Sequence, residues 1–146
     1  MTDVSDDLVQ PFLIEASGLR GRLIRMGPVV NEVISRHDLP SVVQGLMAEF
    51  IVVATALSAA LKFEGIFTLQ AKGNGPVSLL AADITSEGGV RAYASVGKDI
   101  PTAEHIKVSP VPRLLGAGYL AFTVDQGNHA ELYQGCLLYT SDAADE

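Results

Sequence analysis

The sequence has almost none of the residues that cross-link a protein or ligate soft metals. It contains one cysteine, Cys136, among 146 residues. A single thiol cannot form an intramolecular disulfide or a thiolate metal cluster, so both are excluded within this chain. Tryptophan is absent and aromatic residues make up only 6% of the chain. Valine, leucine, isoleucine and alanine must therefore build most of the core.

Basic charge is scarce as well. Lysine and arginine number 10 against 17 aspartates and glutamates, which gives a formal net charge of −7. A protein that binds nucleic acid needs a basic face to displace counterions from phosphates. The only basic concentration is Arg20, Arg22 and Arg25, which we interpret as a solvated strand edge. The composition argues against nucleic acid as a partner.

Long apolar runs are also missing. The longest, Phe50 to Leu61, is closed by Glu49 and Lys62 and is shorter than the roughly 18–20 residues of a membrane span. It fits a buried core helix better, and no membrane partner is expected. The acidic segment Met1 to Asp7 has no positive region followed by an apolar stretch. No secretory signal is visible there, so we expect a cytoplasmic protein.

The residues that are present suit one globular domain, with 48% hydrophobic and 18% charged residues. Apolar spacing predicts helices over 29–36 and 42–61. Alternation predicts strands over 19–26, 66–72, 77–84, 90–96 and 119–125, with a further strand from 131. The proline-rich stretch from Gly97 to Gly118 is predicted to be a long loop. Strands grouped after helices indicate α+β, a twisted, mainly antiparallel sheet with helices packed on one face.

Several short segments occur in a characteristic order. They are Leu-Arg-Gly-Arg-Leu at 19–23, His-Asp-Leu-Pro at 37–40, Leu-Lys-Phe-Glu-Gly at 61–65 followed by Phe-Thr-Leu-Gln at 67–70, Gly-Asn-Gly-Pro at 73–76, and Tyr-Gln-Gly at 133–135. No single segment is diagnostic, but the ordered set resembles the heat-shock protein 33 family of redox-regulated 33 kDa chaperonins. The resemblance extends over about Leu8 to Gly135.

That resemblance implies an ATP-independent holdase that binds unfolding client proteins. Residues 1–135 would be an incomplete N-terminal domain for client binding and dimerisation, truncated before its last elements. The family's C-terminal domain carries Cys-x-Cys and Cys-x-x-Cys, which hold zinc when reduced and form disulfides on oxidation. None of those four cysteines is in this sequence. Zinc is therefore expected only in the full-length protein, with no cofactor in this chain, and a homodimer is expected when that protein is activated.

The end of the chain departs from the family pattern. Residues 136–146, Cys-Leu-Leu-Tyr-Thr-Ser-Asp-Ala-Ala-Asp-Glu, match a translated adapter from transposon-based sequencing libraries. We interpret them as a foreign tail, and a natural divergent tail is the alternative. If the tail is foreign, the remaining chain has no cysteine at all.

No pattern of catalytic or metal-ligating residues stands out. The Gly73–Pro76 segment lacks the Lys-Ser/Thr ending of a phosphate loop, so a hairpin turn is predicted. His37, His105 and His129 are isolated in the sequence, and Ser58 lies in an apolar helix without a nucleophile pattern around it. We predict no enzyme, no catalytic residue and no metal site. The alternative is a small-molecule or nucleotide enzyme that uses the Gly73–Pro76 loop.

Apolar side chains on both faces of several strands point to a binding surface. A half-solvated antiparallel sheet has a polar outer face, so a second apolar face needs a cover. Missing C-terminal segments could supply that cover, or a purely structural dimer could bury the face permanently. The residues predicted for the coverable, client-binding surface are Ile24, Met26, Ile66, Leu80, Tyr93 and Tyr119.

Overall fold

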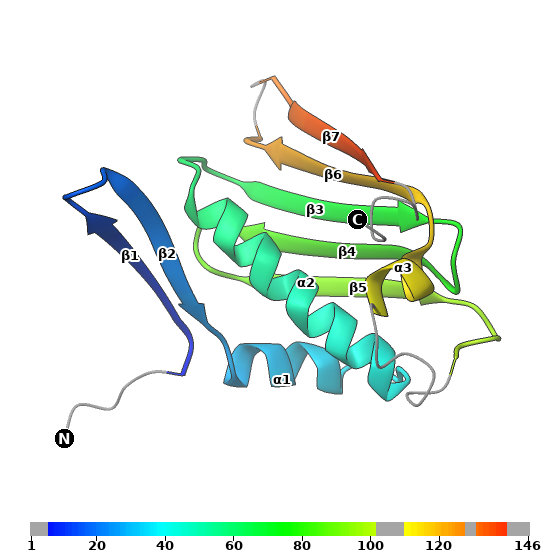
Figure 1. The fold of residues 1–146 in the computed structure, drawn as a ribbon. Helices are drawn as coiled ribbons and strands as arrows, with labels where there is room; N and C mark the ends of the chain where they lie inside the picture. Colours follow the sequence, from blue (N-terminus) through cyan, green and yellow to red (C-terminus); the bar gives the residue numbers. More distant parts are fainter. Residues whose placement is uncertain (1–5, 102–109, 128–130, 140–146) are drawn as a thin grey trace.

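The computed structural model describes residues 6–101, 110–127 and 131–139 (Figure 1). A two-stranded hairpin comes first and is followed by two helices and a five-stranded sheet. The elements are β1 (Leu8–Ile14), β2 (Leu19–Arg25), α1 (Pro28–Ser35), α2 (Ser41–Ala59), β3 (Ile66–Gly73), β4 (Val77–Thr85), β5 (Val90–Val96), α3 (Pro110–Leu115), β6 (Gly118–Asp125) and β7 (Tyr133–Tyr139).

The main sheet is antiparallel throughout, in the order β5-β4-β3-β6-β7. β3 lies at its centre, where Phe67 is paired with Ile84 on one side and Val124 on the other. Since side chains alternate across a strand, these residues share a face with Leu69 and Ala71. That face is buried, so the period-2 pattern of the sequence correctly located the core side of β3.

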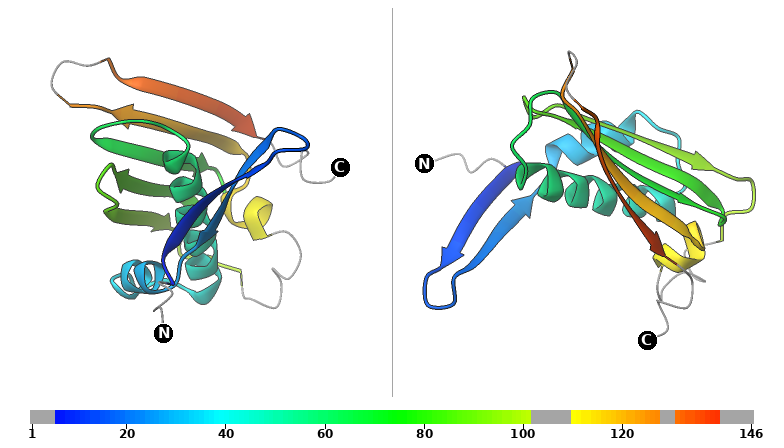
Figure 2. Two further views of the ribbon diagram at one scale, coloured as in Figure 1. Left: turned by 90° about the vertical axis from the view of Figure 1, so that its left-hand side faces the viewer. Right: turned by 90° about the horizontal axis from the view of Figure 1, so that it is seen from above.

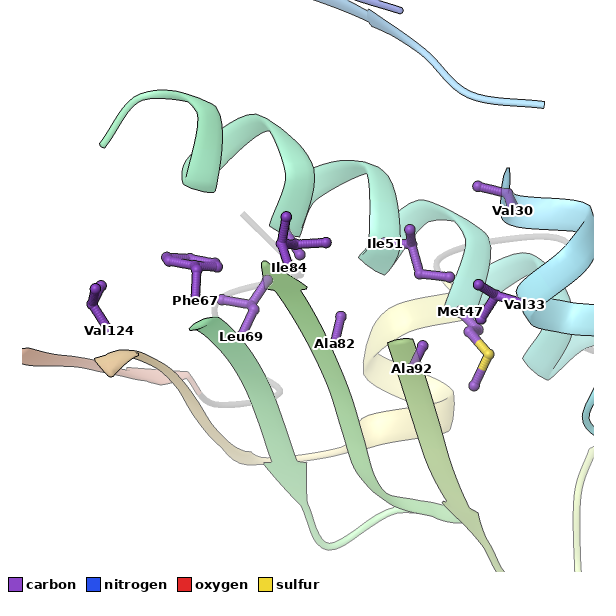
Figure 3. Packing of buried hydrophobic residues seen from close by; sticks show 11 residues of the cluster. Val30, Val33, Met47, Ile51, Phe67, Leu69, Ala82, Ile84, Ala92 and Val124 are labelled. Atoms are coloured by element: carbon purple, nitrogen blue, oxygen red, sulfur yellow. The ribbon is translucent and has the colours of Figure 1, made fainter. Parts of the chain in front are cut away.

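The helices pack on that face of the sheet. α2 crosses it diagonally (Figure 1), and Met47 and Ile51 on α2 are buried together with Phe67 and Leu69 (Figure 3). α1 adds Val33 to the same cluster, and α3 supplies Leu114 and Leu115 to a second cluster beside β4. The expected α+β architecture, with a mainly antiparallel sheet and helices on one face, is confirmed.

α2 is covered on more than one side, though not all round. The hairpin lies across the helix from the sheet (Figure 2) and contacts it through β2. Val53 and Leu57 remain exposed on α2. By length and composition α2 could cross a membrane, a test that core helices of globular proteins also pass. Its buried residues hold it against the sheet, so it forms the central helix of the fold.

The β1–β2 hairpin contains a strand that the alternation pattern did not predict. Its turn needs a left-handed residue, and Gly18 supplies it with φ of 66°. Asp7, just before β1, fastens the base of the hairpin to α1. Its carboxylate accepts hydrogen bonds from the backbone N–H groups of Gly27 (2.9 Å) and Val29 (3.2 Å). The N-terminus of α1 is thus capped by a residue distant in sequence.

Two other expectations need correction. The predicted loop from Gly97 to Gly118 contains α3, because its prolines lie in the first turn, where a missing N–H costs nothing. Residues 102–109 of that loop lie outside the described residues. The last strand begins at Tyr133 rather than 131, and it runs on past Gly135 to Tyr139.

Candidate functional site

One face of the hairpin carries large apolar side chains that are exposed. The β1–β2 register places these residues on the same face, and each is between 37% and 59% exposed. We call this set the hairpin patch: Leu8, Phe12, Ile14, Leu19 and Leu23. An isolated two-stranded hairpin is at best marginally stable in water. A hairpin of this composition is therefore suited to contact with another apolar surface.

Further exposed apolar groups lie on α2, which the opposite face of the hairpin approaches at Val9. Val53 and Leu57 lie one helical turn apart, on a side of the helix that the sheet does not cover. A hollow of about 420 Å³ beside Val53 is lined by Met26 at the base of the hairpin and by Val30 on α1. The hairpin and the outer side of α2 thus form an extensive apolar region away from the sheet.

The core side of the sheet is not fully covered either. α2 lies over β3, β4 and β5, whereas β6 and β7 extend beyond it (Figure 1). Phe122 stacks on Phe67 with ring centroids 5.9 Å apart, and Tyr133 packs on Phe122 at 5.8 Å. Tyr133 remains exposed. The three aromatic rings therefore form a row that runs from the buried core to the exposed edge of the sheet at β7.

The opposite face of the sheet is largely polar. Thr68 donates a hydrogen bond to one carboxylate oxygen of Asp83 (2.7 Å), and Arg91 donates to the other from Nε (3.0 Å). Gln70 and Lys72 of β3 lie on the same face. The apolar second face inferred from the sequence is therefore interrupted by a network of charged and hydroxyl groups that links β3, β4 and β5.

Leu80 does not lie on a coverable surface. It is 0% exposed and belongs to the core cluster with Val43 and Leu114. The pairing of β4 with β5 shifts between Val77 and Leu79, and such a bulge reverses the alternation that follows it. Val77 and Leu80 consequently both point inward, and Leu79 is the outward residue. The assignment of Leu80 was wrong for this reason.

The other five predicted residues do not form one patch. Ile24 and Met26 are half-buried at the base of the hairpin, and Met26 packs against the main core. Ile66, Tyr93 and Tyr119 lie on the polar face, on strands β3, β5 and β6. Tyr93 is the most exposed of them, at 54%. Their role in client binding stays a prediction, and only Ile24 and Met26 lie at the hairpin, Ile24 on the face opposite the hairpin patch.

The hairpin patch was missed although the sequence carried a signal for it. Residues 8–14 are apolar at most positions, residues 15–18 end in Ser-Gly, and residues 19–25 alternate. Two apolar runs separated by a short turn with glycine are typical of a hairpin. Pro11 obscured the first run, yet proline is tolerated on an edge strand such as β1.

The Gly73–Pro76 loop makes internal contacts that leave no phosphate cradle. The backbone N–H of Asn74 donates to the carbonyl of Ala117 (3.1 Å), and that of Gly75 to the carbonyl of Leu115 (2.9 Å). A Cβ at Gly73 would collide with the Leu115 carbonyl oxygen. The loop is a tight turn whose backbone N–H groups already bond to the carbonyls of Ala117 and Leu115. This agrees with the predicted hairpin turn.

The other candidate residues have ordinary surroundings. Ser58 is buried and donates to the Thr55 carbonyl within α2 (2.9 Å). His37 is half-buried after α1, and His105 and His129 lie outside the described residues. Across the described ranges, no three His, Cys, Asp or Glu side chains gather closely enough to hold a metal ion. These residues do not fit a zinc-thiolate site.

The end of β7 packs beside the Gly73 turn. The hydroxyl of Tyr139 donates to the carbonyl of Lys72 (3.3 Å), and burial raises its pKa above the usual 10.0. Cys136 on the same strand is exposed. Residues 140–146 lie outside the described residues, so the origin of the 136–146 segment stays a prediction.

Comparisons with known proteins agree on one family. A family model described as Hsp33 protein matches residues 7–144. The chain is 38% identical over 136 residues to a 33 kDa chaperonin of Caulobacter vibrioides, covering 92% of this chain and 45% of the relative. It is 32% identical over 129 residues to the 33 kDa chaperonin of Escherichia coli, covering 88% and 42%.

A solved structure supports the same grouping. The crystal structure of a 33 kDa chaperonin, a heat shock protein 33 homologue from Thermotoga maritima, superposes with a TM-score of 0.78 at 25% identity. The match covers 93% of this chain and 47% of that one. The chain therefore spans less than half the length of the relatives that it matches.

Proposed function

This chain belongs to the Hsp33 protein family, and from that premise we propose that it forms the client-binding part of an ATP-independent holdase chaperone. The holdase would bind unfolding proteins through exposed apolar surface, without covalent chemistry. Such binding is weakly specific, and its strength grows with the apolar area removed from water. The role assigns residues 1–135 to client binding and dimerisation.

The observation that carries this proposal is the hairpin patch. Five large apolar side chains on one face of a projecting hairpin are exposed in the described part of the chain. The hairpin lies away from the main core (Figure 2), so contacts on this face do not disturb the packing of the sheet. An unfolding protein that exposes its own apolar residues is a suitable partner.

We propose that regulation belongs to the longer protein. The zinc-bound thiols expected from the family would lie outside the residues seen here, because this sequence has one cysteine. In that protein, release of zinc on oxidation would uncover apolar surface for clients and favour a homodimer. The cytoplasmic location expected from the sequence is part of the same proposal.

A light-scattering assay tests the proposed role. The chain is mixed with a thermally unfolding reporter enzyme, and aggregation is followed with and without the double substitution Phe12→Ser, Leu23→Ser. We expect wild-type chain to suppress aggregation and the double variant to require at least threefold more protein for the same effect. Both residues are exposed, so circular dichroism should show an unchanged fold.

Val111→Ser is the matched control, because Val111 is an exposed apolar residue on α3, outside the patch. The pair Tyr93→Ser, Tyr119→Ser tests the residues predicted from the sequence. Equal suppression by the hairpin variant and the wild type would contradict the proposal. A stable dimer that buries the patch and never suppresses aggregation would favour a purely structural module instead.

A further inference from the structure

The free edge of β5 has a feature that the proposed function does not use. β5 is the last strand on its side of the sheet, and among the described residues no strand pairs with its outer side. α1 lies beside this edge (Figure 1). A groove of about 590 Å³ separates them, with Val33, Arg36 and His37 on the helix side and Ala92 and Tyr93 on the strand side.

The hydrogen bond that opens the β4–β5 ladder shows in which direction the backbone groups of β5 point. The N–H of Thr85 donates to the carbonyl of Gly89 at 2.9 Å, and in an antiparallel ladder successive residues turn these groups to opposite sides. The odd-numbered residues of β5 therefore bond to β4. The even-numbered Val90, Ala92 and Ala94 turn their N–H and C=O groups toward the groove.

Ala92 makes this edge unusual. It is only 5% exposed, and none of the backbone hydrogen bonds among the described residues satisfies its groove-facing groups. Unpaired backbone groups along a sheet edge are a template for pairing with another strand. A strand laid along β5 would supply the missing donor and acceptor.

The charges around the groove favour one kind of strand. Arg36 and Arg91 line it, and Asp83 is the only carboxylate among its lining residues. The Asp83 carboxylate already accepts from Thr68 and Arg91, while the Arg91 side chain is 79% exposed and keeps further donors for a second partner. Arg36 is already paired with Glu32 at 2.7 Å, so Arg91 is the cation that an acidic residue of the added strand would meet.

We propose that the groove between β5 and α1 binds an extended polypeptide segment, which adds to the sheet as a strand beside β5 and places an acidic side chain next to Arg91. The segment would come from an unfolding client, so the identity of the partner rests on the proposed function. Recognition here is by backbone pairing, whereas the hairpin patch binds by apolar contact alone.

The alternation of side chains along β5 determines which side chain the added strand should carry at each position. Residues opposite Arg91 and Tyr93 fall on the outer face, where cross-strand partners of opposite charge and aromatic type are favoured. The residue of the added strand that lies between these two residues faces Val33 on α1. Because Ala92 is only 5% exposed at this point, there is room only for a small side chain. In a strand antiparallel to β5, the preferred pattern from the N-terminus is aromatic, small, then acidic.

Fluorescence anisotropy with a labelled eight-residue peptide centred on Tyr-Ala-Asp tests the groove on the full 146-residue chain. We expect saturable binding, at least tenfold weaker when Lys replaces Asp. N-methylation at alternate positions gives two further peptides, only one of which loses the N–H groups that pair with β5. That peptide should bind at least tenfold more weakly, while the other keeps its affinity. Equal affinities for the two would overturn strand addition.

Arg91→Gln should weaken binding of the acidic peptide at least threefold, and Arg20→Gln, an exposed arginine on the hairpin outside both surfaces, should leave it unchanged. Equal effects of the two substitutions would overturn the assigned site. The Phe12→Ser, Leu23→Ser variant should bind the peptide normally. Peptide binding without any suppression of aggregation would contradict the proposed function and leave the groove standing. Suppression without peptide binding would do the reverse.

Discussion

At the scale of single residues, packing decides which of two neighbouring leucines matters. Leu80 on β4 is fully buried against α2 and α3, whereas Leu79 on the same strand is half-buried on the polar face. Both are leucines in the same strand. If side chains are assumed to alternate strictly from Val77, Leu79 is assigned inward and Leu80 outward, which is the reverse of what the structure shows. The bulge between Val77 and Leu79 is therefore the local feature with the largest consequence for the predicted site.

Leu80→Ala is expected to lower the free energy of unfolding by about 2–5 kcal/mol, because it leaves a cavity in a close-packed cluster. Leu79→Ala is the matched control and should cost less than about 1 kcal/mol, since that side chain is half exposed. Urea unfolding followed by circular dichroism measures both. Equal losses for the two variants would contradict the inward position of Leu80.

At the scale of elements, the hairpin is held in place mainly at its base. The Asp7 carboxylate caps α1 through Gly27 and Val29, and β2 touches α2. Asp7→Ala should destabilise the chain by about 1 kcal/mol, the usual cost of losing a helix cap. Hydrogen exchange of hairpin amides should become faster at the same time, because the base of the hairpin loses an anchor.

Asp6→Ala is the control for that experiment. Asp6 pairs with Arg25 at 2.7 Å, but both side chains are more than half exposed, so the loss should be a few tenths of a kcal/mol. If hairpin exchange is unaffected by Asp7→Ala while α1 loses protection, the carboxylate caps the helix without holding the hairpin.

At the scale of the whole molecule, β7 closes one edge of the sheet. Removing residues 136–146 strips Cys136 to Tyr139 from β6 and exposes its backbone groups, a known route to aggregation. We expect the shortened chain to unfold a few degrees lower, since roughly 1 kcal/mol shifts a domain of this size by about 3–4 °C. It should also scatter more light at equal concentration.

Removing only residues 140–146 keeps β7 and serves as the control, with no expected change in unfolding temperature. If both deletions behave like the parent chain, the pairing of 136–139 contributes nothing measurable to the fold. That result would fit the interpretation of 136–146 as a foreign tail.

Local pattern determined much of this protein by itself. The positions of α1, α2 and β3 to β6, the α+β class and the turn at Gly73–Pro76 followed from periodicity and turn residues, and the ordered short segments resembled the family that the comparisons show. These features depend on neighbours in sequence, where side-chain period and backbone preference act directly. The predicted boundaries lie within a residue or two of those observed.

Tertiary structure alone decided which apolar residues are exposed. The inward turn of Leu80 depends on pairing with β5, the projection of the hairpin depends on α2, and the enclosed edge at Ala92 depends on α1. Exposure is a property of what packs against a side chain, and those partners lie far away in the sequence. A one-residue shift in a strand exchanges its faces, so surfaces built from strands follow from the assembled sheet rather than from the alternation of any one segment.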